Sequence, residues 1–456
     1  MQSSEVTGGR KHLPPGPRPW PLIGNVGALR GVLPFLEHQW RTYGDIFQVR
    51  VGPQRLLVIA GPDLIQQVLV TQRQKYVKGR TYDGIRTIAG DSVLTLNGER
   101  WKERRAMEQP AFHRQSLEKL AAIMVETGAR FFDGLAQRVG VTGRELDVHP
   151  QMVRLTLDVV INTLFGRGTL EGGQISYRAL EEALELVSVS ANGVQLPAWV
   201  PTPHNLKYQR TLRELNTNVY QIIRVARERE TEGTLLSMLL AVRDEQGQPL
   251  SDRALRDEVI TMVLAGHETT ALTLTWFFVL LEHHPEVLAR LRDEVDQVLA
   301  GREPSFADLS KLTYVRQVVD EVLRLRPPAP MVARDAEVED ELGGFDVAPG
   351  QSVVPFIWAV HRHPEHWPDP LHFNPERFNP AANKARHQGS YVPFSLGPRS
   401  CIGNSFALFE AVILLSQLVS RFDLAIGDCS GVKAVAIGST RPSRPVRVRL
   451  SPRRRK

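Results

Sequence analysis

The segment best suited to chemistry surrounds Cys401, in the run Phe394-Ser-Leu-Gly-Pro-Arg-Ser-Cys-Ile-Gly403. A helical apolar pattern follows from Ala407, so we expect the cysteine just before or at the start of a helix. The amides and dipole of a helix start favour negative charge, which lowers a thiol pKa and favours thiolate. Gly397 and Gly403 permit tight backbone on each side. The thiolate could be a nucleophile or a metal ligand, and the plain alternative is a buried free cysteine.

A second unusual segment interrupts a long apolar helix that we expect over residues 251–284. The run Ala265-Gly-His-Glu-Thr-Thr270 places a glycine and two threonines in mid-helix, where they are poor choices. A glutamate there is costly unless it is used. The plain reading is a bent helix with Glu268 at a polar edge. The functional reading is that Gly266 leaves room for a ligand and a threonine hydroxyl opens the backbone ladder.

Two further pairs have helical spacing. Glu321 and Arg324 are three residues apart, and Trp101 and Arg105 are four apart, so each pair shares a helix face. Alone, the first pair predicts an ordinary surface ion pair, which contributes little stability. The second predicts a packed tryptophan beside a surface arginine, although an N–H and a guanidinium also suit carboxylates.

The elements that position these residues are mainly helical. A proline-rich lead-in ends near residue 20, and a β-hairpin is expected over residues 45–60. Helical periodicity dominates residues 98–330, and strand patterns return at residues 351–356 and 446–450. We find no repeat or linker, so we expect a single domain over residues 1–456 that is mainly α with small β-sheets, with a basic tail at residues 451–456.

Composition excludes several classes of protein. The 456 residues are 42% hydrophobic and 23% charged, as in ordinary globular proteins rather than disordered or fibrous ones. Two cysteines exclude a disulfide framework. Without a long apolar run or a signal peptide, we expect a cytoplasmic protein with no membrane span. The net charge of +6 favours a solvated basic tail and an acidic protein partner over nucleic acid.

The histidines near residue 363 invite a zinc hypothesis. His361, His363 and His366 are close in sequence, but they lack the cysteine or carboxylate framework of a typical zinc site. Pro364 also breaks any helix between them. The sequence therefore argues against zinc at these histidines.

The cysteine segment resembles the F-x-x-G-x-R-x-C-x-G signature of the cytochrome P450 haem-thiolate monooxygenases, soluble bacterial type. Phe394, Gly397, Arg399, Cys401 and Gly403 match every fixed position. The resemblance implies the cytochrome P450 fold, a triangular helical body with haem b between the long oxygen-binding helix and the cysteine-bearing helix. It implies that Cys401 ligates the iron, with Phe394 and Gly403 beside the cofactor and Arg399 at a haem propionate.

The other motifs resemble the same family in the same order. The segment at residues 265–270 resembles its oxygen-binding motif, which implies that Thr269 hydrogen-bonds the oxygen being activated and Glu268 relays protons. Trp101 and Arg105 match its W-x-x-x-R helix and imply two more propionate contacts. Arg362 is expected to supply a fourth, although His361 could substitute.

The segment that contains Glu321 and Arg324 resembles the family's E-x-x-R helix, and Pro375-Glu-Arg-Phe378 resembles its P-E-R-F segment. The resemblance implies that Glu321, Arg324 and Arg377 form a structural triad that holds the core behind the haem.

The implied activity is activation of O₂ with two external electrons and hydroxylation or epoxidation of an apolar small molecule, such as a fatty acid, terpenoid or polyketide. Electrons are expected from a separate ferredoxin or flavodoxin with its reductase and NAD(P)H, and the chain is expected to be a monomer. A peroxide-driven or redox-neutral enzyme and a haem sensor or electron carrier remain alternatives. The expected pocket residues are small or apolar, with residues 82–96 as a flexible lid. They are Val263, Ala265, Gly266, Ala329, Met331 and Val332.

Overall fold

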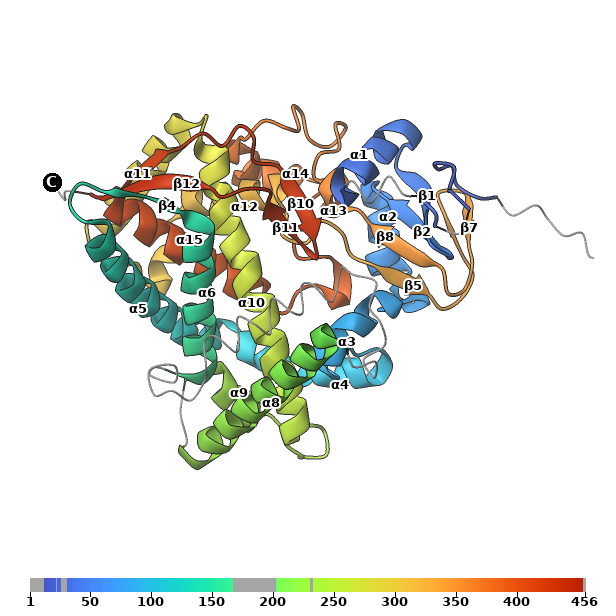
Figure 1. Cartoon of the computed structure of the whole chain (residues 1–456), viewed down its shortest axis with the longest axis horizontal. Coiled ribbons are helices and arrows are strands. Elements are labelled where there is room, and N and C mark those ends of the chain that lie inside the picture. The colour runs from blue at the N-terminus through green and yellow to red at the C-terminus, as the bar shows by residue number, and fades with distance from the viewer. Residues whose placement is uncertain (1–11, 22, 26–30, 167–201, 230–232, 454–456) are drawn as a thin grey trace, which may run out of the picture. The chain divides into compact units, whose positions relative to one another are not determined.

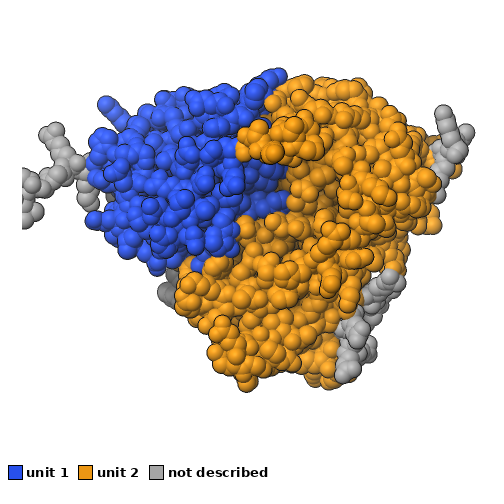
Figure 2. Space-filling view, turned by 180° about the vertical axis from the view of Figure 1, so that it is seen from behind, with its two compact units in different colours: residues 1–81, 331–370, 387–399 blue, residues 82–330, 371–386, 400–456 orange. Residues whose placement is uncertain are grey.

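The structure, a computed structural model, describes residues 12–21, 23–25, 31–166, 202–229 and 233–453. The start of the proline-rich lead-in and the last three residues of the basic tail lie outside this part of the chain. The described chain forms two compact units, coloured separately in Figure 2, and each unit is assembled from three stretches. Unit 1 draws on residues 1–81, 331–370 and 387–399, and unit 2 on residues 82–330, 371–386 and 400–456.

Unit 1 is built on a five-stranded sheet in the order β1-β2-β8-β5-β3. The expected hairpin is confirmed, since β1 pairs antiparallel with β2 and Val51 lies opposite Gln54. Strand β8 adds parallel to β2, and the apolar face of this sheet packs into a core with Leu57, Val353 and Ile357. The strands of unit 1 are β1 (Ile46–Val51), β2 (Gln54–Ile59), β3 (Tyr76–Val77), β5 (Arg334–Ala336), β6 (Asp340–Leu342), β7 (Phe345–Val347) and β8 (Ser352–Pro355). Its helices and helical turns are α1 (Val32–Tyr43), α2 (Pro62–Gln66), η2 (Gln67–Thr71), η3 (Arg73–Lys75), α13 (Ile357–Val360), η8 (Gln388–Ser390) and η9 (Gly397–Arg399).

Unit 2 is mainly helical, with α10 running among the other helices and α6 packed along it (Figure 1). Its helices are α3 (Asp83–Ala89), α4 (Gly98–Glu108), α5 (Arg114–Val139), α6 (Val148–Phe165), α8 (Pro203–Arg229), α9 (Leu235–Ala241), α10 (Asp252–Leu281), α11 (Pro285–Leu299), α12 (Thr313–Leu325), α14 (Pro380–Ala385) and α15 (Asn404–Arg421). Its short helical turns are η5 (Gln109–Phe112), η6 (Phe306–Ser310) and η7 (Pro375–Phe378). The turn η4 (Arg80–Tyr82) includes the point where the chain leaves unit 1, after residue 81, and enters unit 2.

Helix α10 confirms the long helix expected from the sequence. Ser251 caps it, because its side chain accepts a hydrogen bond from the backbone N–H of Ala254. By length and composition α10 could cross a membrane, yet 61% of its most apolar window is buried inside the protein. Burial of this kind is typical of a core helix.

Two small sheets complete the strands of unit 2. β12 (Arg447–Pro452) lies between β4 (Arg144–Asp147) and β9 (Phe422–Ile426), and β10 (Ala434–Ile437) pairs with β11 (Ser439–Pro442). In β12 the side chains of Val448 and Leu450 are buried while Arg447 and Arg449 are exposed, as the alternating sequence predicts. The predicted fold class, mainly α with small sheets, is confirmed, and the single domain stays a prediction.

Candidate active site

Cys401 lies where the sequence predicts, two residues before Gly403, which is the N-cap of α15. Its side chain is exposed, whereas the chain's other cysteine, Cys429, is buried. Burial, with the nearby Glu282 carboxylate, raises the pKa of the Cys429 thiol to about 11. Of the two thiols, Cys401 is therefore the one placed to meet a ligand from outside the protein.

The chain before the cysteine is tightly constrained within unit 1. Ser395 and Gly397 both have positive φ angles, 63° and 74°. A Cβ at Gly397 would lie 2.2 Å from the carbonyl oxygen of Leu69 in η2, so only glycine fits there. The matched Phe394 and Arg399 are both partly exposed on this segment. Backbone packing against Leu69 thus explains why the signature has a glycine at position 397.

Helix α4 lies against the cysteine segment of unit 2. Arg105 donates a hydrogen bond to the carbonyl oxygen of Ser400 at 3.0 Å and another to Gln109 at 3.0 Å. Burial holds the pKa of Arg105 below its ordinary value, while Cys401 and Glu108 oppose that effect. Trp101, 9% exposed, packs with Val93 and Leu96. The structure therefore brings Arg105 to the cysteine loop, and the propionate roles of Trp101 and Arg105 stay predictions.

The Ala265–Thr270 segment has one uncovered face. Ala265 is exposed and Thr269 partly exposed, although Val263 and His267 on the same helix are buried. A Cβ at Gly266 would lie 3.0 Å from a Val160 methyl group, so this glycine fits the packing of α10 against α6. The bare side of Gly266 thus faces α6, and its role in the ligand pocket stays a prediction.

The two residues expected to handle oxygen and protons have defined partners. The hydroxyl of Thr269 donates to the carbonyl oxygen of Ala265 at 2.9 Å. The carboxylate of Glu268 accepts from the hydroxyl of Ser439 and from Nε of Arg441, each at 2.7 Å. Glu268 is thus an ion-paired carboxylate at a polar edge, joined to β11. Its side chain is 23% exposed, so water can reach it.

A buried acid that the sequence reasoning missed lies beside this segment. Glu410 of α15 is fully buried, and its Oε2 accepts a hydrogen bond from the hydroxyl of Thr270 at 2.9 Å. Burial raises its pKa to about 8, against the opposing effect of the Thr270 hydrogen bond. Glu410 is therefore mainly protonated at neutral pH and joins α15 to α10. A charged residue within the apolar pattern of α15 was the available signal.

The predicted triad is present in unit 2. Arg324 donates to both carboxylate oxygens of Glu321, at 2.6 and 2.7 Å, and both side chains are fully buried. The backbone N–H of Asn374 donates to Glu321 at 2.9 Å, and Nε of Arg377 lies 3.6 Å from the same carboxylate. The plain reading of a surface ion pair is therefore wrong. The pair anchors the segment that enters η7 to helix α12.

The fourth expected propionate contact has a different setting. Arg362, 3% exposed, lies with its guanidinium carbon 3.5 Å from the centre of the Trp358 ring and donates to the Trp358 carbonyl oxygen at 2.8 Å. His361 is fully buried, and its Nε2 accepts from the N–H of Val392 at 2.9 Å. Both residues thus have packing roles in unit 1. Arg334 in β5, a buried arginine that follows the expected pocket segment, is a further cation that the sequence reasoning missed.

The expected pocket residues divide between the units. Val263 is buried in unit 2, where Ala329 is partly exposed. Met331 and Val332 belong to unit 1, and Val332 packs against the core of the sheet. Their role in substrate binding stays a prediction.

Two fully buried carboxyl groups join α4 to α10. Oε1 of Glu258 accepts from the N–H of Val93 and from Arg104, each at 2.8 Å. Both oxygens of Glu108 and Oε2 of Glu258 are buried without a donor among the described residues. Burial, reinforced by Glu258, raises the pKa of Glu108 well above its ordinary value. Burial also raises the pKa of Glu258 to about 7, against the opposing effect of Arg104. The pair is best satisfied when the two carboxyls share a proton.

This pair gives a pH-dependent stability. Because both folded-state pKa values lie above those of exposed carboxyls, the stabilisation is complete at about pH 4 and is lost as pH rises through the folded-state pKa of Glu258, about 7. Glu108→Gln is expected to flatten this slope and to stabilise the protein at pH 8 by about 1–3 kcal/mol. Thermal unfolding midpoints between pH 5 and pH 8 measure it.

Glu99→Gln, at an exposed glutamate of the same helix, is the matched control. We expect its pH curve to run parallel to that of the unchanged protein. Parallel curves for both variants would show that the buried pair does not share a proton.

The residues of unit 2 suit a haem with a thiolate ligand. An exposed thiol precedes a helix start, the guanidinium of Arg105 reaches its loop, and the small residue Ala265 leaves α10 uncovered. Thiolate sulfur is a soft ligand that binds haem iron, and propionates require cationic or N–H partners. The donor set therefore fits the group that the signature implies.

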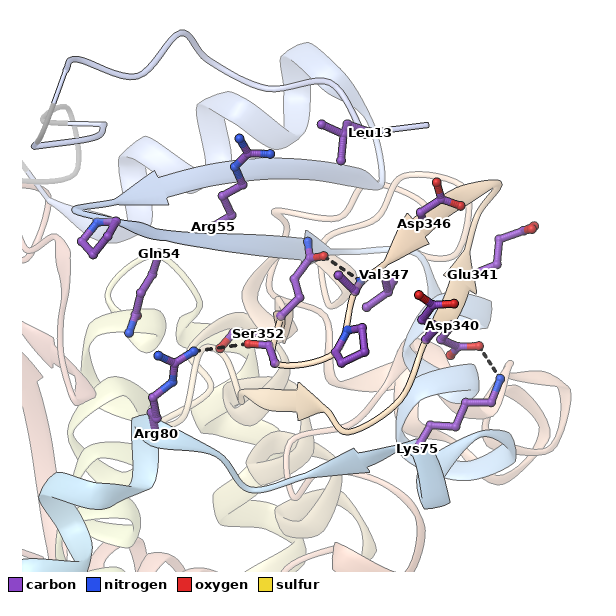
Figure 3. A pocket seen from close by; sticks show the side chains of 16 residues that line it. Leu13, Gln54, Arg55, Lys75, Arg80, Asp340, Glu341, Asp346, Val347 and Ser352 are labelled. Atoms are coloured by element: carbon purple, nitrogen blue, oxygen red, sulfur yellow. Dashed lines mark hydrogen bonds and ion pairs between the residues drawn. The ribbon is translucent and has the colours of Figure 1, made fainter. Parts of the chain in front are cut away.

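A separate cavity of about 900 Å³ lies in unit 1 and is lined by charged side chains (Figure 3). Lys75 donates to Asp340 at 2.6 Å, and Arg80 donates to the Gly350 carbonyl oxygen at 3.3 Å. None of the residues matched to the cysteine signature lines it. Its charges are unsuited to an apolar substrate, so we do not assign the active site to it.

Comparison with known proteins gives a family match over nearly the whole chain. Residues 14–448 match the family model described as Cytochrome P450. The chain is 35% identical over 441 residues to cyclooctat-9-en-7-ol 5-monooxygenase of Streptomyces melanosporofaciens, covering 92% of this chain and 93% of that protein. It is 33% identical to pentalenene oxygenase of Streptomyces avermitilis, covering 94% and 98%.

Solved structures with the same fold are found as well. The crystal structure of the cytochrome P450DA heme domain superimposes with a TM-score of 0.87 at 28% identity, covering 98% of this chain and 99% of that one. A cyanobacterial CYP120A1 with retinoic acid bound gives a TM-score of 0.87 at 26% identity, covering 97% and 100%.

Proposed function

The chain belongs to the cytochrome P450 family and is a haem-dependent monooxygenase, and we propose that it hydroxylates or epoxidises an apolar small molecule of the terpenoid class. The single observation that carries the site is the exposed thiol of Cys401, on a signature loop that Arg105 reaches. The terpenoid class is supported by the names of two relatives, a cyclooctat-9-en-7-ol monooxygenase and a pentalenene oxygenase.

The cofactor we propose is haem b. The chain's two cysteines, Cys401 and Cys429, are 28 positions apart, so no C-x-x-C-H segment for covalent haem attachment exists in this sequence. Cys401 would supply the iron ligand, and Trp101, Arg105 and Arg399 would bind the propionates, with Arg334 a further buried cation of unit 1. When bound, a thiolate-ligated haem supplies activation of O₂.

The residues of α10 would manage protons and water. The hydroxyl of Thr269 would leave its bond to the Ala265 carbonyl oxygen and donate toward the oxygen being activated. Glu268, partly exposed and held by Arg441 and Ser439, would pass protons inward from water. Glu410 is protonated and accepts a hydrogen bond from Thr270, the residue after Thr269 on α10. By fixing Thr270, Glu410 would help to keep Thr269 oriented.

The enzyme requires O₂ and a redox partner, which we propose is a ferredoxin or flavodoxin with its own reductase and NAD(P)H as the donor. The exposed cations Arg100 and Lys102 on α4 pair with Asp91 and Glu99, so they do not by themselves form a basic docking patch. The net charge of +6 on the chain is what favours an acidic partner. We also propose that the protein acts as a cytoplasmic monomer.

The test begins with an absorption spectrum of the reduced protein under carbon monoxide, where a strongly red-shifted Soret band is expected. Pentalenene and related terpene hydrocarbons are then incubated with a surrogate ferredoxin, its reductase, NADPH and isotopically labelled O₂. A product that carries one labelled oxygen atom is expected. Equal turnover with hydrogen peroxide alone would instead favour the peroxide-driven alternative, and labelled products only from fatty acids would overturn the terpenoid class.

Thr269→Ala is expected to keep haem and the red-shifted band but to divert most electrons into hydrogen peroxide, because the hydroxyl that positions protons is lost. Peroxide released per NADPH consumed measures the effect, which we expect to be several-fold. Thr273→Ala is the matched control, because the Thr273 hydroxyl makes the same bond to the carbonyl four residues earlier, at 2.9 Å. Unchanged coupling in Thr269→Ala would remove this residue from proton delivery.

A further inference from the structure

Three side chains of unit 1 converge although their sequence argues against it. His363, Glu365 and His366 each present a ligand atom, and these atoms all lie within 4.8 Å of one another. Pro364 breaks the helix between them, but the resulting turn still brings the rings of His363 and His366 to 5.1 Å. His361 is not part of the cluster, because its Nε2 accepts from Val392. Glu365 supplies the carboxylate ligand that the sequence analysis did not find near these histidines.

The tautomer of His363 is set from outside the cluster. Nε2 of His363 lies 3.1 Å from Oδ2 of Asp45, and Asp45 in turn accepts from Nε1 of Trp40 at 2.9 Å. Nδ1 of His363 accepts a hydrogen bond from the backbone N–H of Glu365 at 3.3 Å, so it carries the lone pair, and a bound metal ion would replace this long hydrogen bond. A carboxylate that binds the far nitrogen of a histidine is the usual support of a metal-binding imidazole.

The burial and the charge state of the cluster also favour metal binding. The His363 side chain is 8% exposed and therefore fixed, whereas Glu365 is exposed and His366 partly exposed, so an ion can enter from solvent. Burial, together with His363 and His387, holds the pKa of His366 below its ordinary value. A neutral imidazole with an available lone pair is the form that binds metal.

We propose that His363, Glu365 and His366 bind a divalent transition-metal ion, Zn²⁺ by ligand type, with water in the fourth position. Two imidazole nitrogens and one carboxylate oxygen form a ligand set that zinc uses in proteins. Asp45 is the positioning residue of the site, since it contacts His363 rather than the ion. The site is independent of the cysteine chemistry and holds the turn that follows α13.

The test is calorimetric titration of the tag-free, haem-loaded protein with zinc chloride after treatment with a chelator. We expect one ion per chain. His366→Gln and Glu365→Gln, both at solvent-accessible positions, are expected to abolish measurable binding without loss of folding. Asp45→Asn is expected to weaken affinity by about 10–100-fold. Zinc soaked into crystals should give an anomalous peak between the three side chains.

His283→Gln is the matched control. His283 is 73% exposed in unit 2 and lies 3.4 Å from the neighbouring Glu282, so it offers a similar histidine and carboxylate without the convergent ring. Its zinc binding should equal that of the unchanged protein. Absence of a binding isotherm, or affinity unchanged by both His366→Gln and Glu365→Gln, would overturn the proposal.

Discussion

Cys401→His is expected to lose the red-shifted band of the reduced, carbon-monoxide-treated protein and all measurable oxygenation. Imidazole is a neutral ligand and cannot supply the electron density that a thiolate gives to haem iron. The spectrum and the yield of labelled product, each relative to haem content, measure the effect.

The chain offers its own control in Cys429. Cys429→Ser removes the only other thiol in the sequence, and Cys429 is buried. The backbone N–H of Cys429, rather than its sulfur, donates to Glu282 at 2.8 Å, so the substitution keeps this bond. Its spectrum and activity should be unchanged once haem content is matched. If the Cys401 variant kept the red-shifted band, Cys401 would not be the iron ligand. If the Cys429 variant lost the band, the ligand would instead be Cys429.

Local patterns were sufficient to predict the parts of the site that lie within one stretch of chain. The cysteine loop, the start of α15 and the length of α10 follow from residue spacing, because glycine positions and apolar periodicity act over a few residues. The W-x-x-x-R match identified Arg105, which the structure brings to the Ser400 carbonyl oxygen across a long interval of sequence.

The parts that escaped prediction depend on which surfaces meet in three dimensions. The pairing of Glu108 with Glu258, and of Glu410 with Thr270, joins residues of different helices, and no spacing rule reports such contacts. The packing of Gly266 against α6 escaped prediction for the same reason, since only the position of Val160 shows which side of α10 it faces. The turn at Pro364 shows the converse, because breaking a helix did not keep His363 and His366 apart.

Arg324→Leu is expected to destabilise the protein by about 3–5 kcal/mol, the largest stability effect that we predict for a single substitution. The variant leaves the Glu321 carboxylate fully buried, with the Asn374 N–H at 2.9 Å and Nε of Arg377 at 3.6 Å among the described residues. It also removes the donor to the His372 carbonyl oxygen, 3.2 Å away. Soluble yield, haem retention and the midpoint of urea unfolding measure the loss.

The exposed pair Glu99 and Lys102 on α4 is the matched control, because it has the same charge order and the same three-residue spacing. Lys102→Leu should change the unfolding midpoint little, since solvent screens that pair. The contrast isolates burial as the cause, because sequence spacing is identical in the two cases. If both variants lost the same small amount, the triad would be an ordinary ion pair. The segment entering η7 would then be held by the packing of Phe378 and Phe373, both buried, rather than by charge.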